Sequence, residues 1–174
     1  MKKQKLAGRK VRCPLVKEQL GELILTSQDT LYRVSKTILK SDADCADAIS
    51  ETIVKAFSKI HTLKQDNYAK TWLIRILINE CYRILRHGKK IVPLEDCFMT
   101  ENVSEENRDY SDLYEAVSRL PEKIRTCVTL YYMEDFSVKE IAAMLEITES
   151  AVKNRLARAR AKLREELTDL EVMQ

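Results

Sequence analysis

Glycine and proline are scarce in this chain, with three of each among 174 residues. Both residues interrupt helices, proline because it lacks a backbone N–H and glycine because it loses the most backbone entropy on folding. The remaining sequence is rich in Leu, Ile, Lys, Glu and Arg, which favour helix. With 33% charged and 45% hydrophobic residues, the composition is that of an ordinary globular protein. The sequence therefore predicts an all-α fold.

Motifs for metal binding, disulfide scaffolds and catalysis are also missing. The five cysteines are odd in number and form no C-x-x-C pair, which favours a reduced cytoplasmic compartment and gives no zinc-site spacing. His61 and His87 are isolated, and the chain has no glycine-rich phosphate loop. We expect a protein that is not an enzyme and that needs no cofactor or metal.

Long apolar segments are absent as well. No apolar run approaches the ~20 residues that a membrane-spanning helix needs. Residues 1–19 are basic, but no apolar stretch follows the basic residues as it would in a secretory signal. We interpret this segment as a disordered N-terminal arm.

Charge divides the chain into three parts. Residues 1–90 hold 19 Lys and Arg against 9 Asp and Glu (net +10), residues 91–111 hold 1 against 6 (net −5), and residues 112–174 hold 10 against 12 (net −2). The middle part has little helical periodicity, as is typical of a linker. We therefore predict two small helical domains, residues 20–90 and 112–174, joined by a flexible acidic linker.

Helical spacing is clear in the first domain. One opening helix, or two with a break between Ser27 and Asp29, is marked by Leu20, Leu23, Ile24, Leu31, Val34 and Ile38. Ser41 or Asp42 is the expected cap of a second helix. Its apolar residues are Ile49, Ile53, Ala56 and Ile60, and its acids on other faces are Asp44, Asp47 and Glu51. These acids offer a partner surface, although Asp44 alone is equally explained by the helix dipole.

A third helix is expected from Thr71 to about His87, after an exposed polar loop over residues 61–70. One face of this helix is apolar. A polar, basic and aromatic stripe spans roughly 100° on another face, and it consists of Arg75, Asn79, Tyr82, Arg83 and Arg86. Such a stripe suits single-stranded nucleic acid, because cations follow the backbone while rings and amides contact exposed bases. Taken alone, it is more often a solvated face.

Residues 137–163 have the pattern of a helix-turn-helix. Ser137 and Glu140 have the spacing of a capping box, in which each side chain bonds the other residue's backbone N–H, so a helix is expected to begin here. A short turn follows, and its Thr148 can cap the next helix. The apolar stripe of this second helix consists of Val152, Leu156 and Leu163.

The second of these helices is strongly basic, since residues 149–164 contain six Lys or Arg and one acid, Glu149. The residues off its apolar stripe include Lys153, Asn154, Ala157, Arg158 and Arg160. A basic helix by itself is usually a solvated face. Because this one follows a capping box and a turn, the pattern predicts a recognition helix for duplex DNA.

Several of these segments are similar to a known family. Residues 44–52, 56–57 and 72–76, with Asn79 and Arg83, resemble region 2 of the extracytoplasmic-function (group 4) sigma factors of bacterial RNA polymerase. The second domain resembles region 4 of the same family in Leu120-Pro121 and in residues 137–142 and 152–160. The resemblance covers nearly all of residues 20–167, with both regions in the family's order around a short linker.

The resemblance implies a site for each promoter element. For the −35 element, it implies base contacts from Lys153, Asn154, Ala157 and Arg158 and a phosphate contact from Arg155, although Ala157 is smaller than the residue common there. For recognition and melting of the −10 element, it implies the loop residues Lys64, Gln65, Asp66, Asn67 and Tyr68, together with Arg75, Asn79 and Arg83. This loop is the most divergent part of the match.

The resemblance also implies partners. Asp47, Ser50 and Glu51 match the surface that docks on the β′ clamp helices of core RNA polymerase, with Ser50 in place of the usual Gln. The β flap of the polymerase, promoter DNA and a membrane-anchored anti-sigma factor are the other implied partners, with no small-molecule substrate. Two other functions fit the same fold: an ordinary helix-turn-helix regulator, and a sigma-like adaptor that titrates an anti-sigma factor. The stripe between Arg75 and Arg86 argues against the first, and the basic recognition helix argues against the second.

Overall fold

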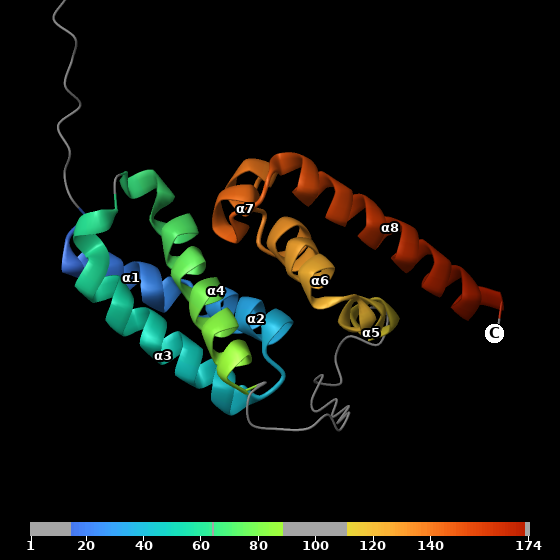
Figure 1. Ribbon diagram of the computed structural model, residues 1–174, viewed down its shortest axis with the longest axis horizontal. Coiled ribbons are helices and arrows are strands. Elements are labelled where there is room, and N and C mark those ends of the chain that lie inside the picture. Colours follow the sequence, from blue (N-terminus) through green and yellow to red (C-terminus); the bar gives the residue numbers. More distant parts are fainter. Residues whose placement is uncertain (1–14, 64, 89–110, 173–174) are drawn as a thin grey trace, which may run out of the picture.

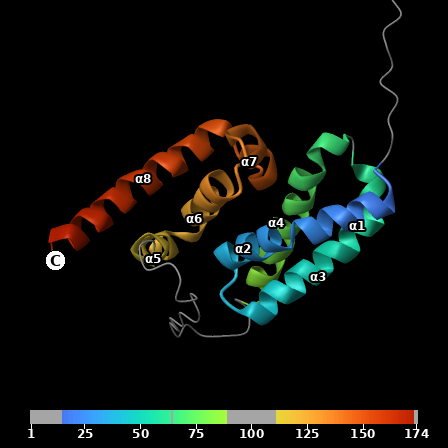
Figure 2. The ribbon, with the colours of Figure 1, turned by 180° about the vertical axis from the view of Figure 1, so that it is seen from behind.

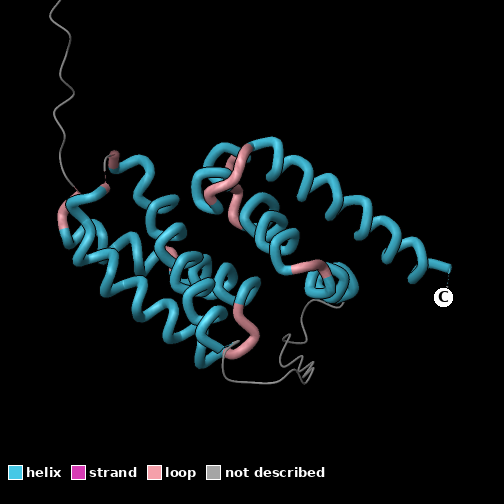
Figure 3. The backbone as a smooth tube through the Cα atoms, in the orientation of Figure 1, coloured by secondary structure: helices cyan, strands magenta, loops and turns pink. Residues whose placement is uncertain are grey.

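The computed structural model describes residues 15–63, 65–88 and 111–172. The described residues form α-helices joined by short turns, with no strand among them, which confirms the all-α prediction (Figure 3). Two lobes are visible in Figure 1, the first built from α1 to α4 and the second from α5 to α8. The predicted linker, residues 91–111, lies almost wholly outside the described residues, and α5 begins at Ser111.

The first lobe contains α1 (Lys17–Thr26), α2 (Gln28–Ile38), α3 (Asp42–Lys59) and α4 (Ala69–Gly88). The opening segment is two helices, because Ser27 leaves the helical conformation at φ −103° and ψ 7°. At the start of α3 the expected cap is confirmed, with the Asp44 backbone N–H donating to Ser41 Oγ at 3.4 Å. The helix α4 begins two residues before the expected Thr71, following short 3-10 turns at Ile60–Thr62 and Asp66–Tyr68.

The second lobe contains α5 (Ser111–Arg119), α6 (Glu122–Val128), a π-helical turn (Thr129–Met133), α7 (Val138–Leu145) and α8 (Glu149–Val172). Pro121 precedes α6, where its fixed φ and missing N–H suit a helix start. The long helix α8 packs against α5, α6 and α7. In Figures 1 and 2 its C-terminal end points away from the first lobe.

The apolar core runs through both lobes. In the first lobe Leu31, Leu73 and Leu77 are fully buried where α2, α3 and α4 meet. In the second lobe Ile141 and Val152 are fully buried between α7 and α8. Between the lobes α4 packs on α7 and α2 packs on α6, so the two groups of helices share one continuous set of buried side chains.

The structure contains neither a membrane span nor a metal-ligand cluster among its described residues. No helix in the described ranges is both long and apolar enough to cross a bilayer. The same ranges hold no group of His, Cys, Asp and Glu side chains able to bind a metal ion. Cys45, Cys81 and Cys127 are free thiols in the core, and burial raises the pKa of Cys81 to about 12.

Candidate nucleic-acid interface

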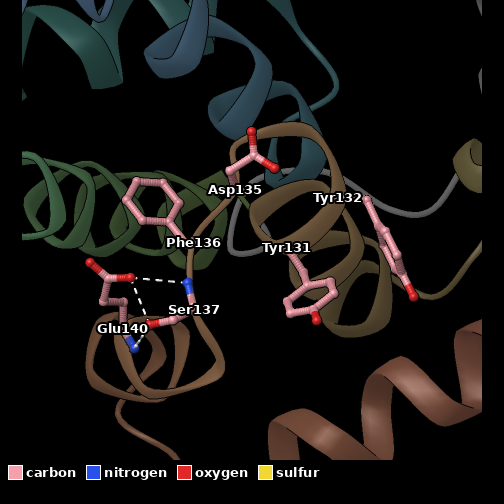
Figure 4. A pocket seen from close by; sticks show the side chains of 6 residues that line it. All are labelled: Tyr131, Tyr132, Asp135, Phe136, Ser137 and Glu140. Carbon is pink, nitrogen blue, oxygen red and sulfur yellow. Dashed lines mark hydrogen bonds between the residues drawn. The ribbon is translucent and has the colours of Figure 1, made fainter.

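The N-terminus of α7 carries the predicted capping box. The Glu140 backbone N–H donates to Ser137 Oγ at 3.3 Å, and the Ser137 N–H donates to Glu140 Oε2 at 3.0 Å (Figure 4). The bond from the Ser137 hydroxyl, at 2.7 Å, is the main reason that the pKa of Glu140 is lowered. These bonds are local to four residues, and they fix where the first helix of the helix-turn-helix begins.

The turn between α7 and α8 forms as expected. Glu146 ends α7 in the left-handed conformation, with φ 55° and ψ 42°. The Thr148 hydroxyl accepts the Ala151 N–H at 3.1 Å, which confirms Thr148 as a cap of α8. The turn therefore ends α7 and begins α8 within a few residues, as in a helix-turn-helix.

Most of the predicted −35 residues are solvent-exposed on one side of α8, namely Lys153, Asn154, Ala157 and Arg158. Val152, Leu156 and Ala159 are buried on the other side and hold the helix against α6 and α7. Arg155 is only half-buried, and its Nη1 lies 4.0 Å from Cys127 Sγ in α6. It therefore sits at the edge between the exposed face and the core.

The stripe on α4 is also mainly exposed, in Arg75, Asn79, Arg83 and Arg86. Tyr82 differs from this description because it is half-buried. Burial, followed by the nearby Glu122 carboxylate, raises the pKa of Tyr82 above its ordinary value. The stripe is thus a basic and amide surface whose predicted aromatic member packs toward the second lobe.

The loop before α4 is exposed at Gln65, Asp66, Asn67 and Tyr68, and Lys64 lies outside the described residues. Tyr68 is 49% exposed, so its ring is available to a flat ligand such as a base. The 3-10 turn at Asp66–Tyr68 leads directly into α4. The loop residues and the α4 stripe therefore belong to one continuous stretch of chain.

Glu80 is a functional candidate that periodicity alone did not reveal. Its side chain is 8% exposed and accepts from Lys55 Nζ at 2.6 Å and from Arg83 Nε at 2.7 Å. Burial alone would raise the pKa of Glu80, but the bonds from Lys55 and Arg83 outweigh that effect, so its pKa lies below the ordinary value. Through this ion pair, Glu80 restrains the side chain of Arg83, which lies one helical turn from Asn79 on α4. The sequence signal is the i,i+3 spacing of Glu80 and Arg83, which places an acid beside the edge of the basic stripe.

The acidic residues proposed for partner binding lie on α3. Asp47 and Ser50 are exposed, and Glu51 is half-exposed with its carboxylate 3.5 Å from Lys55 Nζ. Because α3 packs within the first lobe against α2 and α4, these residues remain on the lobe's outer surface.

Two hollows mark the second lobe. One, drawn in Figure 4, lies beside the capping box and is lined by Tyr131, Tyr132, Asp135, Phe136, Ser137 and Glu140. The two tyrosine rings meet edge to face, with centroids 4.9 Å apart. The other is an apolar groove between α5, the π-helical turn and α8, lined by Leu113, Val117, Val128, Tyr132, Met133, Arg160 and Leu163. In the first hollow the Ser137 hydroxyl and the Glu140 carboxylate are both engaged in the capping box.

Comparisons with known proteins match both lobes. The sigma-70 region 2 family matches residues 23–91, and the sigma-70 region 4 family matches residues 110–163. The RNA polymerase sigma factor SigV of Bacillus subtilis is 31% identical over 155 residues, which cover 87% of this chain and 93% of that protein. The RNA polymerase sigma-E factor of Streptomyces coelicolor is 30% identical, with 86% of each chain covered.

A solved structure has the same arrangement of helices. The sigma factor RpoE of Bartonella quintana, crystallised with the anti-sigma factor NepR, aligns with a TM-score of 0.74 and 26% identity. The alignment covers 88% of this chain and 98% of that one.

Proposed function

The chain belongs to the extracytoplasmic-function sigma factors of the sigma-70 family, transcription initiation factors rather than enzymes, and we propose a division of promoter recognition between its two lobes. The second lobe reads the −35 element as duplex, and the first lobe reads the −10 element as separated strands. The main observation behind this proposal is that both sigma regions match in one chain, in the family's order.

In the second lobe, Lys153, Asn154 and Arg158 contact base edges in the major groove. Their exposure on one side of α8, opposite the buried residues, supports this role. Ala157 on the same side has no hydrogen-bonding group, so it offers a base only an apolar contact. Arg155 holds a phosphate, because its position at the edge of this face suits the DNA backbone better than the base edges.

In the first lobe, the segment from Lys64 to Tyr68 and the stripe Arg75, Asn79 and Arg83 bind the melted strand. Flipping a base out of a duplex costs a few kcal/mol, so a melting protein needs a preformed platform with cations beside it. The exposed ring of Tyr68 and the exposed amide of Asn79 supply contacts to bases, while the arginines supply charge.

Two surfaces bind core RNA polymerase. Asp47, Ser50 and Glu51 on α3 contact the β′ clamp helices. Ser50 has a shorter side chain than the usual glutamine, so this one contact is weaker. The apolar groove beside Val117 and Leu163 receives the β flap, since a groove with one cation, Arg160, suits a largely apolar segment.

An anti-sigma factor controls the protein. The similarity to RpoE, a sigma factor solved with its anti-sigma factor, supports this proposal. We place the protein in the cytoplasm, where the polymerase is, and propose that a membrane-anchored anti-sigma factor holds it there until a signal arrives.

Transcription in vitro tests the function directly. Core polymerase without sigma, given this protein and a library of promoter fragments, should produce transcripts whose templates share a −35 and a −10 motif. Core alone is the control. An ordinary helix-turn-helix regulator or a sigma-like adaptor would yield no protein-dependent transcripts, and that result would overturn the proposal.

A further inference from the structure

A buried carboxylate of the second lobe forms a hydrogen bond and an ion pair with the first lobe. Glu134 follows the π-helical turn, and its side chain is only 3% exposed. It accepts a hydrogen bond from Thr30 Oγ1 at 2.6 Å and forms an ion pair with Arg33 Nε at 2.7 Å. Thr30 and Arg33 both lie on α2. Burying a carboxylate is costly without such partners, so the closed arrangement of the lobes depends on both bonds.

Arg125 of the second lobe makes a second set of hydrogen bonds to the first lobe, one turn further along α2. Its Nη2 and Nε donate to the backbone oxygen of Thr37 at 2.9 and 3.1 Å. Thr37 lies in the last turn of α2, where carbonyl groups lack partners within the helix and a cation is favoured. Beside this bond, the hydroxyl oxygens of Thr37 and Thr126 are 3.3 Å apart.

A third set of contacts lies over the start of the α4 stripe. Thr71 Oγ1 donates to Glu140 Oε1 at 3.3 Å, and Arg75 pairs with Glu146 in the turn before α8. The Lys70 ammonium lies 5.2 Å from the centre of the Phe136 ring. In this state, Arg75 is therefore occupied by the second lobe rather than free to bind DNA.

The distances on DNA require these contacts to break. Elements centred at −35 and −10 are about 25 base pairs apart, or roughly 85 Å along B-DNA at about 3.4 Å per pair. In the closed state Arg75 on α4 pairs with Glu146, just before α8. The proposed −35 residues of α8 follow Glu146 by no more than about three helical turns, so they lie within about 20 Å of it at 1.5 Å per residue. The closed chain cannot contact both elements at once.

We propose that the chain inhibits itself: Glu134 and Arg125 on the second lobe clasp α2 and hold the lobes in a closed state that covers the start of the −10 surface. Opening of this clasp precedes promoter engagement. The inference rests on the proposed promoter contacts of both lobes. It requires no partner protein, because every contact lies within the chain.

Trapping the closed state tests the clasp. Because their side chains face each other, Thr37→Cys and Thr126→Cys together should form a disulfide under oxidising conditions, seen as a faster band on a non-reducing gel. The oxidised form should support at least tenfold less transcription with core polymerase, and reductant should restore it. The parent chain with oxidant is the control, since its described cysteines are buried. Failure of the disulfide to form, or full activity when it has formed, would overturn the proposal.

Releasing the clasp is the opposite test. Arg33→Glu places a like charge against Glu134, whereas Lys36→Glu makes the same charge change on the same helix against Asp42, within the first lobe. Without polymerase, Arg33→Glu should bind a fluorescent, randomised single-stranded oligonucleotide about tenfold more tightly than the parent, because apparent affinity scales with the open fraction. Lys36→Glu should match the parent. Equal affinities for the two variants would contradict the clasp.

Glu134→Gln is a second opening variant that preserves side-chain shape. It removes the charge that Arg33 neutralises and should tighten binding in the same direction as Arg33→Glu, with an unchanged helical circular-dichroism spectrum. No gain in affinity from this variant would also count against the proposal. If the parent chain itself supports no transcription, the proposed function fails, whereas disulfide formation reports the closed state independently.

Discussion

At the scale of single residues, exposure separates groups that can contact DNA from groups that position them. Arg158 is exposed on α8, whereas Arg155 is half-buried and contacts Cys127 at the edge of the same face. On α4, Asn79 is exposed while its neighbour Glu80 is buried under Arg83 and Lys55. Adjacent or nearby residues therefore have different roles, which substitution can resolve.

Arg158 and Arg155 should give different signatures on −35 DNA. Arg158→Ala should cost ~1–3 kcal/mol on the preferred sequence and much less on scrambled DNA, because a base contact is lost. Arg155→Ala should weaken both DNAs similarly and lower the salt slope by about one, because a phosphate contact is lost. Fluorescence anisotropy across a salt series measures both. Indistinguishable variants would remove α8 from sequence recognition.

Asn79 should act only after the strands separate. Asn79→Ala should leave binding of −35 duplex unchanged and reduce open-complex formation on a linear promoter, because its amide is proposed to contact an unpaired base. Permanganate footprinting of the holoenzyme on linear and pre-melted templates provides the comparison. Equal reactivity for parent and variant on the linear template would exclude Asn79 from the site.

At the scale of elements, short-range bonds set where helices begin and charged pairs join one helix to the next. The capping box at Ser137 defines the start of α7, and Thr148 does the same for α8. Glu80 on α4 and Lys55 on α3 connect two helices of the first lobe. Each arrangement predicts a separate effect on stability.

Loss of the α7 cap should destabilise the helix-turn-helix. Ser137→Ala removes the acceptor of the Glu140 N–H and should lower the free energy of unfolding by about 1 kcal/mol. Ser58→Ala, at an exposed serine inside α3, is the control and should have a much smaller effect. Urea unfolding followed by circular dichroism measures both, and equal losses would argue against the cap.

Glu80 should make stability depend on acid. Its folded pKa is lower than its unfolded pKa, so the ionised form is favoured in the native state. This stabilisation is present above the unfolded value, near 4.5, and is lost as pH falls through the lower folded value. The melting temperature of Glu80→Gln should therefore fall less steeply than that of the parent between neutral and acid pH. Parallel curves would contradict the assignment.

At the scale of the whole molecule, two lobes with their own cores also share a buried boundary. Leu73 and Leu77 pack within the first lobe and Ile141 and Val152 within the second. Thr126 and Glu134 of the second lobe are buried, and each contacts a threonine side chain of α2. The opening proposed above would expose this boundary to solvent while leaving the core of each lobe in place.

The two halves should fold separately. Residues 1–90 and 112–174, expressed alone, should each give a helical circular-dichroism spectrum and a cooperative melt. Both midpoints should lie below that of the full chain, because each half loses the contacts of α2 with α6 and of α4 with α7. A half without a cooperative transition would show that the lobes fold as one unit.

The sequence by itself determined the features that depend on neighbouring residues. Helical periodicity located α3, α4 and α8, and the four-residue capping box located α7, since these bonds form wherever the local chain allows them. The basic side of α8 followed from the same periodicity. The break between α1 and α2 was foreseen as one of two alternatives, because the polar run at Ser27 does not exclude a continuous helix.

Only the tertiary structure decided which surfaces are covered. The bonds that Thr30 and Arg33 donate to Glu134 join residues 104 and 101 positions apart, and no local pattern encodes such pairs. Tyr82 fits an exposed stripe by its spacing, yet the second lobe lies against it. The family resemblance implies a phosphate contact for Arg155, and only the structure shows that its guanidinium also lies 4.0 Å from Cys127 Sγ. Helical spacing gives the direction of a side chain from its own axis, whereas burial depends on what the rest of the chain brings to that side.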